Sequence, residues 1–482
     1  MDEGGKTPDG VRTASAMTRP MTIGGRAVVG TGRLPVEDPA LGTVFADVPD
    51  CGPEALDAAV AAAAATAARW SAVPWDERRE LLLNCAEALA DRAEEVAGLL
   101  TREQGKPLAR ARAEVRLAAD RFGLVAKLTE EPRMVADEPM GYVRVDHVPH
   151  GVVAAIVPSV SPILTAVGTI APALLAGNTV VLKPSPLTPL STLVMGQAVC
   201  DALPPGVLNV ISGAPELGVR LARHPGVALV SFTGSIAAGR RVAAAAAGDL
   251  KAVVLELGGN DPCILLPGVD VAAVAERLFE RAMEAGGQSR AAIKRIYVSR
   301  DQQAELVAAL AALAERVTVG PGTDPDTDLG PLCDAGRLAR LEGLVRSAVE
   351  AGARVATGGH LLDRPGHFYP PTIVTDLPAG TALELEEQCG PVLPVIGYDS
   401  VEEAVARANV SDHALGGSVW GEEGAALETA QLLDADTVWV NTHGALHNDQ
   451  PFGGFRSAGI GVGYGPRGPL DYTREKVLTV SR

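Results

Sequence analysis

The sequence lacks two features that would assign it to a particular class of protein: a basic tract and a long hydrophobic run. Acidic and basic residues are interspersed, and the formal net charge is −17. Nucleic acid and anionic membrane surfaces would repel such a chain, so we predict neither as a partner. The longest apolar run, residues 162–175, covers about 14 residues, fewer than the roughly 20 needed to span a bilayer. We expect a buried helix there.

Paired cysteines are also missing. The six cysteines, at positions 51, 85, 200, 263, 333 and 389, include no pair separated by only two residues, and they fit neither a disulfide framework nor a zinc site. We therefore predict reduced thiols, no metal and a cytoplasmic location. Lysine and aromatic residues are scarce beside alanine, glycine, valine and arginine, a composition typical of a GC-rich bacterial source.

Length and composition predict a globular protein of more than one domain. The chain has 482 residues, of which 47% are hydrophobic and 21% charged. That balance is typical of folded proteins, and the length exceeds what one hydrophobic core usually supports. We expect two or three domains. Residues 1–20 are polar and without periodicity, so we expect a flexible tail there.

Two different patterns of apolar residues follow along the chain. Over residues 53–127 apolar residues recur at helical spacing, which predicts two or three helices, with a break at 104–107. From residue 151 short apolar runs alternate with helical segments, and the alternation restarts near residue 263. Such β-α-β alternation predicts parallel sheets buried on both faces, and the restart predicts two α/β lobes in tandem. Residues 140–148 and 476–480 read as strands outside both lobes.

A glycine-containing turn marks a candidate nucleotide site. An apolar run over 227–232 ends in Thr233-Gly234-Ser235, and Gly239 follows inside the next helical segment. A strand-to-helix turn of this kind offers backbone N–H groups and a helix dipole to a pyrophosphate. The spacing differs from the usual dinucleotide fingerprint, so an ordinary tight turn stays an equal alternative.

Five segments together resemble the aldehyde dehydrogenase superfamily, in the order and at the spacing of that family. They are Lys183-Pro184-Ser185, Phe232-Thr233-Gly234-Ser235 with Gly239, Leu255-Glu256-Leu257-Gly258-Gly259, Glu386-Glu387-Gln388-Cys389-Gly390-Pro391-Val392, and Pro451-Phe452-Gly453-Gly454. The similarity runs from about residue 20 to the end of the chain.

The resemblance implies an α/β fold with three parts. These are a Rossmann-like NAD(P)-binding domain over 21–130 and 149–255, an α/β catalytic-type domain over 256–467, and a small β oligomerisation arm over 131–148 and 468–482. It also implies a homodimer or homotetramer.

The resemblance further implies a set of cofactor-binding positions. They are Lys183, Ser185, Pro186, Thr233, Gly234, Ser235, Gly239, Leu257, Gly258 and Glu387. Many NAD-using members have a glutamate where this chain has Pro186. Its absence removes a carboxylate that would hold the adenosine hydroxyls and repel a 2′-phosphate. NAD and NADP therefore both stay candidates, and weakened or lost cofactor binding stays open.

The catalytic positions depart from the family pattern. The family's nucleophile motif, Gly-Gln-x-Cys, aligns without a gap with Gly287-Gln288-Ser289-Arg290. Arg290 thus stands at the cysteine position, and a guanidinium, which stays protonated, is no nucleophile. Val160 replaces the asparagine that completes the oxyanion hole, a loss worth on the order of 100- to 1000-fold in rate.

The general-base glutamate of the family is retained as Glu256. A buried arginine without a partner is costly, so we predict an ion pair between Arg290 and Glu256, or a bound anion in place of Glu256.

Four further residues are candidates for a substrate pocket: Ser289, Cys389, His443 and His447. Cys389 stands where the family has a phenylalanine beside the nicotinamide, and a small hydrophobic filler is the alternative role. Both histidines lie in a segment that resembles the family's substrate-entrance loop, and ordinary loop histidines are the alternative.

Three functions remain compatible with the sequence. The first is an atypical enzyme or pseudoenzyme that binds a small anionic ligand through Arg290. The second is an NAD(P)-dependent oxidoreductase that works without a covalent thioester. The third is an inert subunit that partners an active paralogue.

Overall fold

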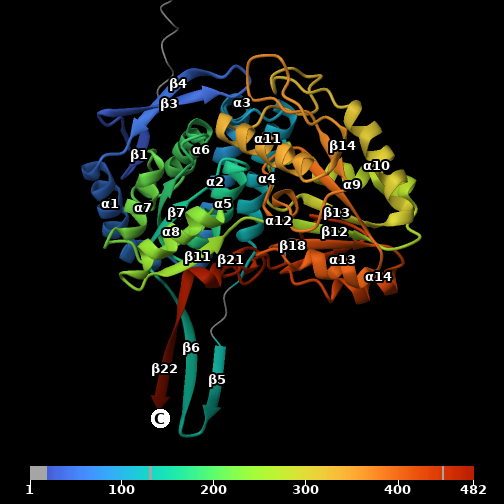
Figure 1. Ribbon diagram of the computed structural model, residues 1–482. Coiled ribbons are helices and arrows are strands. Elements are labelled where there is room, and N and C mark those ends of the chain that lie inside the picture. Colours follow the sequence, from blue (N-terminus) through green and yellow to red (C-terminus); the bar gives the residue numbers. More distant parts are fainter. Residues whose placement is uncertain (1–18, 130–132, 448–449) are drawn as a thin grey trace, which may run out of the picture.

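The computed structural model describes residues 19–129, 133–447 and 450–482. Two α/β lobes lie side by side, and a narrow arm of strands projects from the first of them (Figure 1). The predicted tail at 1–20 falls almost entirely outside the described residues. Among the described helices, none combines the length and the apolar character that crossing a bilayer requires.

The first lobe contains an eight-stranded sheet with a Rossmann-like parallel centre. Its order is β2-β1-β9-β8-β7-β10-β11-β21, and the strands from β9 to β11 are mutually parallel. The bounds are β1 (Met21–Ile23), β2 (Arg26–Val28), β7 (Val152–Ile156), β8 (Thr179–Lys183), β9 (Leu208–Val210), β10 (Leu229–Thr233), β11 (Ala252–Glu256) and β21 (Gly459–Ile460). The chain order reverses between β7 and β10, and ligands of doubly wound sheets bind at such a switch point.

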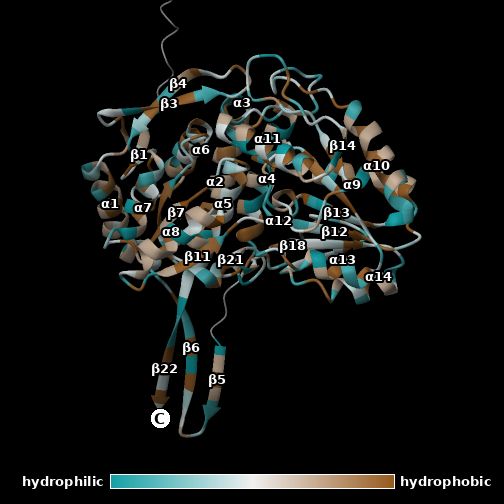
Figure 2. Ribbon diagram, in the orientation of Figure 1, coloured by the Kyte–Doolittle hydropathy of each residue, from teal (hydrophilic) through white to brown (hydrophobic). Residues whose placement is uncertain are grey.

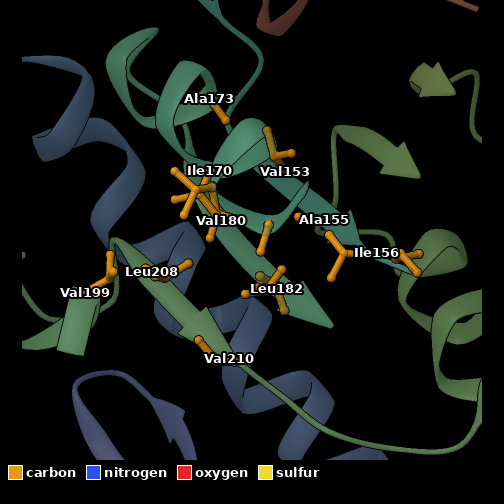
Figure 3. Packing of buried hydrophobic residues seen from close by; sticks show 14 of the residues in the cluster. Val153, Ala155, Ile156, Ile170, Ala173, Val180, Leu182, Val199, Leu208 and Val210 are labelled. Atoms are coloured by element: carbon orange, nitrogen blue, oxygen red, sulfur yellow. The ribbon is translucent and has the colours of Figure 1, made fainter. Parts of the chain in front are cut away.

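The parallel strands form because they are short, rich in β-branched residues and covered on both faces. Every residue of β7, β8 and β10 is buried. In Figure 3 the side chains of Val153 and Val180 lie close to Ile170 of the helix that follows β7, and Leu208 and Val210 continue the same cluster along the sheet. Continuous apolar burial is what parallel sheets require, so this part of the prediction is confirmed.

Eight helices of the described chain belong to the first lobe (Figure 1). They are α1 (Pro53–Ser71), α2 (Trp75–Asp91), α3 (Ala93–Gln104), α4 (Leu108–Val125), α5 (Pro162–Leu175), α6 (Pro189–Asp201), α7 (Pro215–Arg223) and α8 (Ile236–Ala247). The break at 104–107 is confirmed: Gly105 has a φ of 92° and ends α3. The prediction of two or three helices over 53–127 was wrong, because α2 and α3 are separated at Arg92 without any glycine or proline signal.

The second lobe repeats the α/β arrangement around a seven-stranded sheet of order β14-β15-β16-β13-β12-β18-β19. Its strands are β12 (Asp261–Leu265), β13 (Ile293–Ser299), β14 (Arg354–Thr357), β15 (Thr372–Thr375), β16 (Val392–Tyr398), β18 (Gly416–Trp420) and β19 (Thr437–Val440). Its helices are α9 (Val271–Ala282), α10 (Arg300–Glu315), α11 (Ala335–Glu350), α12 (Ala382–Leu385), α13 (Val401–Ala408) and α14 (Glu423–Ala430). Two tandem lobes were predicted, and this is confirmed.

Smaller pieces connect the lobes. Two antiparallel pairs are β3 (Gly32–Asp38) with β4 (Thr43–Asp50), and β17 (His413–Ala414) with β20 (Phe455–Arg456); a 3-10 helix spans Gly468–Tyr472. The strand β21 comes from the end of the segment assigned to the catalytic-type domain, yet it pairs with β11 in the first sheet. From β21 onward the chain therefore returns to the first lobe, which the sequence did not predict.

The arm consists of β5 (Arg133–Glu138), β6 (Gly141–Pro149) and β22 (Thr473–Ser481). β22 pairs with β6 over nine residues, from Thr473 opposite Pro149 to Ser481 opposite Gly141. The two strands predicted to lie outside the lobes therefore form one sheet. Figure 2 shows both hydrophilic and hydrophobic residues along it.

Candidate functional site

The candidate site lies where the carboxyl ends of the central strands of the first lobe approach loops of the second. β8 ends at Lys183, β10 at Thr233 and β11 at Glu256. Because parallel strands end at one edge of their sheet, these three residues share that edge.

The turn from β10 into α8 has the tight packing of a phosphate-binding turn. Thr233 is buried, and the Gly234 N–H donates to the Glu256 carbonyl at 3.1 Å. The Ser235 hydroxyl accepts from the Ala238 N–H at 3.3 Å and so caps the helix. A methyl group at Gly239 would overlap the Leu257 side chain, so glycine permits the close approach of α8 to the chain after β11. Further N–H groups of the first turn of α8 have no partner within the helix.

Lys183 is buried at the end of β8, with 2% of its surface exposed. Its ammonium donates to the Pro184 carbonyl at 2.9 Å, the one hydrogen bond that this group makes with the described residues. Burial lowers the pKa of Lys183 to about 8, against the opposing effect of Asp50 and Glu216. Two ammonium protons thus remain for another acceptor. Ser185 binds locally instead, since its hydroxyl accepts from the Leu187 N–H at 3.2 Å.

Arg290 and Glu256 form an ion pair, as predicted. The Nη2 group of Arg290 donates to Oε2 of Glu256, and Nη1 donates to the Leu257 carbonyl at 3.3 Å. The two side chains are 22% and 14% exposed. The guanidinium also lies 5.6 Å from the ring centroid of Phe452. Arg290 therefore binds the retained glutamate and is directed away from bulk solvent.

A second arginine links the segments that carry positions 160 and 290. Arg337, near the start of α11, donates to the Ser159 hydroxyl at 2.8 Å and to Oε1 of Gln288 at 3.3 Å. The Val160 carbonyl accepts from the Lys106 ammonium at 2.9 Å. Val160 itself adds no side-chain donor to this neighbourhood.

Glu387 lies directly against the chain that follows β11. A methyl group at Gly258 would overlap its carboxylate, so the glycine leaves room for the side chain to lie against the backbone there. Burial raises the pKa of Glu387, while the cations Lys294, Arg290 and Arg337 oppose that rise. Gly258 and Glu387 are thus brought together, as the resemblance implied.

The six thiols share one electrostatic property, a pKa above the ordinary value. Burial is the largest cause in each case, and it raises the pKa to about 11 at Cys51 and to about 12 at Cys85 and Cys263. The pKa is likewise raised at Cys200, Cys333 and Cys389. At Cys389 the neighbouring Glu387 carboxylate raises it further. A thiol with a raised pKa is a poor source of thiolate near neutral pH.

The pocket candidates fall in different environments. His443 is fully enclosed: its ring contacts the Ser418 hydroxyl at 3.0 Å and the Ala291 carbonyl at 3.2 Å, and burial lowers its pKa to about 3. It does not line an entrance, because both ring nitrogens are used inside the second lobe. His447 is exposed, and its backbone N–H donates to the Gln450 side chain at 3.2 Å. Ser289 is half-buried beside Arg290.

Two residues that sequence reasoning missed lie near the ion pair. Arg121 of α4 places its guanidinium 4.2 Å from the ring centroid of Tyr464. Tyr464 in turn meets Phe452 edge to face, with ring centroids 6.2 Å apart. Nothing in the sequence separates Arg121 from the other arginines of its helix. Among the described residues no cluster of three or more metal-binding side chains occurs.

Comparison with known proteins agrees with the fold and the motifs. The profile of the aldehyde dehydrogenase family matches residues 28–478. The phenylacetaldehyde dehydrogenase of Pseudomonas fluorescens is 36% identical, with 98% of this chain and 97% of that protein covered. The crystal structure of lactaldehyde dehydrogenase from Escherichia coli superposes with a TM-score of 0.94 at 33% identity, covering 97% of this chain and 100% of that one. An NAD+ complex of the Bacillus cereus aldehyde dehydrogenase superposes with a TM-score of 0.94 at 31% identity, covering 96% of this chain and 97% of that one. The chain belongs to the aldehyde dehydrogenase family and has the fold of its NAD(P)-dependent oxidoreductases.

Proposed function

We propose that this chain is a member of the family that keeps the nucleotide-binding scaffold, does not oxidise aldehydes through a thioester, and binds a small anionic ligand. The observation that carries the proposal is the Arg290–Glu256 pair. It sets a permanent cation at the family's nucleophile position and engages the family's general base.

The chemistry of the thiols supports the proposal. Thioester formation needs a thiolate that attacks the carbonyl carbon of the aldehyde. Each of the six cysteines is in surroundings that raise its pKa, and five of the six are buried. Cys389, the partly exposed one, has the Glu387 carboxylate as a neighbour, which disfavours its thiolate further.

The surroundings of Val160 and Glu256 also weigh against oxidation. A tetrahedral oxyanion needs a fixed donor, and an isopropyl side chain offers none. Glu256 already accepts a hydrogen bond from Arg290. The guanidinium occupies Oε2, so this oxygen is not free to accept a hydrogen bond from water or a hydrate, and a route to oxidation without a thioester is not favoured either.

The residues present fit a nicotinamide dinucleotide. Lys183 has two ammonium protons to offer to ribose hydroxyls, and the capped start of α8 offers N–H groups to a pyrophosphate. We assign Glu387, which lies against Gly258, as an acceptor for hydroxyls of the second ribose. A bound dinucleotide would supply a hydride acceptor. Solved relatives are described as complexes with NAD+ and with NAP.

Cofactor choice is the least constrained part of the proposal. Pro186 carries no carboxylate, so NAD gains no extra contact there and a 2′-phosphate meets no like charge. We propose weak selectivity between NAD and NADP. The change Pro186→Glu should then favour NAD, and a calorimetric titration of both nucleotides measures the shift.

We also propose a cytoplasmic homodimer or homotetramer, assembled through the arm of β5, β6 and β22. Support for this comes from the three-stranded arm itself, whose outer strands β22 and β5 are sheet edges.

The experiment that tests the proposal combines two measurements on the purified chain. Titration with NAD and NADP should give binding that weakens in Lys183→Ala. Absorbance of the reduced cofactor over a panel of aliphatic and aromatic aldehydes should show no turnover. Turnover that iodoacetamide abolishes would overturn the proposal. Turnover that resists iodoacetamide would identify a thioester-free oxidoreductase, and failure to bind either nucleotide would identify an inert subunit.

A further inference from the structure

Arg121 is a buried cation whose hydrogen-bond donors the protein does not satisfy. Only 8% of its surface is exposed, and its Nε atom is enclosed without a hydrogen-bond partner. Neither an ion pair nor a hydrogen bond joins its guanidinium to any of the described residues. Burial lowers the pKa of Arg121, which reflects the cost of enclosing this charge. A buried guanidinium normally requires acceptors, so the position calls for an explanation.

Stacking holds the guanidinium in place but uses none of its N–H groups. The guanidinium carbon lies 4.2 Å from the centroid of the Tyr464 ring. That ring also meets Phe452 edge to face, with ring centroids 6.2 Å apart, and its hydroxyl lies beside Gly168 of α5. A cation over an aromatic face is stabilised, yet its in-plane donors stay available for a bidentate acceptor.

Tyr464 has a constrained backbone and an unused hydroxyl. Its φ is 66°, in the left-handed region that residues other than glycine seldom adopt. The surrounding structure must therefore hold this residue in place. Its hydroxyl makes no hydrogen bond with the described residues, and burial raises its pKa, so it stays a neutral phenol. It can donate to an anion beside Arg121.

Arg121 shares its neighbourhood with the Arg290–Glu256 pair but takes no part in that pair. Glu256 interacts electrostatically with both Arg121 and Tyr464, and so does Arg290 with Tyr464. These groups therefore share one neighbourhood. Within it the Glu256 carboxylate is already neutralised by Arg290. Arg121 forms no ion pair with any of the described residues, and the nearby Asp471 carboxylate accepts from the Val462 N–H instead, so the guanidinium can take an anionic partner.

We propose that Arg121, aided by the Tyr464 hydroxyl, binds the carboxylate of a small monocarboxylate ligand beside the Arg290–Glu256 pair. This inference rests on the proposed function and names its ligand class. It moves the anchor of the anion from Arg290, whose donors Glu256 and Leu257 engage, to an arginine whose donors are unused. A carboxylate matches the planar fork of arginine and the single charge.

The test is a titration of wild-type protein with acetate, propionate, butyrate, benzoate and phenylacetate, each against its primary amide. Calorimetry and thermal unfolding are the readouts, and inorganic phosphate is a third arm. We expect at least one carboxylate to bind and to raise the melting temperature, while its amide does not. Binding of phosphate alone, or of no probe, would overturn the inference.

Variants then assign the site. Arg121→Met should lower the affinity for the carboxylate roughly 10- to 100-fold. The melting temperature of the unliganded protein should stay the same or rise, because an unsatisfied buried charge is removed. Arg116→Met, an exposed arginine of the same helix, is the control and should bind as wild type does. A lower unliganded melting temperature with unchanged carboxylate affinity would show that Arg121 is structural and would contradict the inference.

Two further variants keep the test decisive if Arg121→Met does not fold. Arg121→Lys retains the positive charge but not the planar pair of guanidinium donors, and Tyr464→Phe removes only the hydroxyl. Each change should lower the affinity for the carboxylate. Unchanged affinity in both would overturn the inference. Nucleotide affinity and the aldehyde assay, measured on the same preparations, should not change in any of these variants. Failure of the inference is thereby separable from failure of the proposed function.

Discussion

At the scale of single residues, the side chain at position 290 occupies hydrogen-bond acceptors of Glu256 and Leu257. The guanidinium donates hydrogen bonds to one carboxylate oxygen of Glu256 and to the backbone carbonyl of Leu257. The Leu257 segment also packs against Gly239 of α8, so the pair lies next to the nucleotide turn. A change at 290 should therefore alter the surroundings of both Glu256 and the turn between β10 and α8.

Removal of Glu256 should destabilise the protein through the charge that it leaves behind. A fully buried pair broken on one side costs about 3–5 kcal/mol. Here the side chains are 22% and 14% exposed, so we expect Glu256→Ala to lower the free energy of unfolding by about 1–3 kcal/mol. Urea unfolding measures this.

The matched control is Asp399→Ala, which breaks the exposed pair with Arg300, whose side chains are 58% and 71% exposed. Its effect should be much smaller, because solvent screens that pair. Equal losses in the two variants would contradict the structural role assigned to the Arg290–Glu256 pair.

Lys183 should make stability depend on pH in the alkaline range. Burial lowers its pKa from the ordinary 10.5 to about 8. Between these values the unfolded lysine binds a proton that the folded one has lost, so the free energy of unfolding rises with pH. Relative to Lys183→Met, the free energy of unfolding of wild type should rise by on the order of 3 kcal/mol between these two pH values. Lys127→Met, at an exposed position, is the control.

Urea unfolding of the three proteins between pH 7 and pH 10.5 checks this expectation. A difference between wild type and Lys183→Met that does not change with pH would show that the ammonium is better solvated than its burial indicates.

Site residues were predictable from the sequence only where a motif surrounds them. The Arg290–Glu256 pair followed from two family motifs and from the cost of a lone buried arginine. Arg121 could not be predicted, because α4 carries several arginines and helical spacing does not distinguish one that stacks on Tyr464. His443 was misplaced for a related reason: a loop residue near a family motif can turn inward when acceptors such as Ala291 are available.

At the scale of elements, strands with continuous apolar character were predictable and short irregular ones were not. The parallel strands β7, β8 and β10 bury every residue, which gives a clear signal in the sequence. The boundary between α2 and α3 at Arg92 gives none. The two-residue strand β21 depends on its antiparallel pairing with β11, a tertiary contact that no local pattern encodes.

The arm makes a prediction of its own about assembly. β22 pairs with β6 along nine residues, and its Val477 is exposed on the single chain. An exposed edge strand presents unpaired N–H and C=O groups that can pair with a strand of another chain. We expect the intact chain to be a dimer or tetramer in light scattering, and deletion of residues 473–482 to give monomers or insoluble protein. A stable monomer of the intact chain would refute this assignment of the arm.

At the scale of the whole molecule, the family fold is kept, and the proposed change in chemistry depends on a few positions. Structures of relatives superpose with TM-scores of 0.94 over nearly the entire chain. The three positions on which the proposal depends lie in loops: residues 160 and 186 follow the carboxyl ends of β7 and β8, and residue 290 precedes β13. Such loops tolerate substitution because the sheets beneath them carry the stability. A repair at these positions should therefore fold.

The measurement that tests the central claim most directly compares wild type with a repaired site. The rate of cofactor reduction with aldehydes is measured for wild type, Arg290→Cys and Arg290→Cys with Val160→Asn. We predict no rate above the blank for wild type, little or none for the single variant, and a rate for the double variant on the order of 100-fold or more above the single. A wild-type rate equal to that of the double variant, and lost on alkylation, would contradict the account.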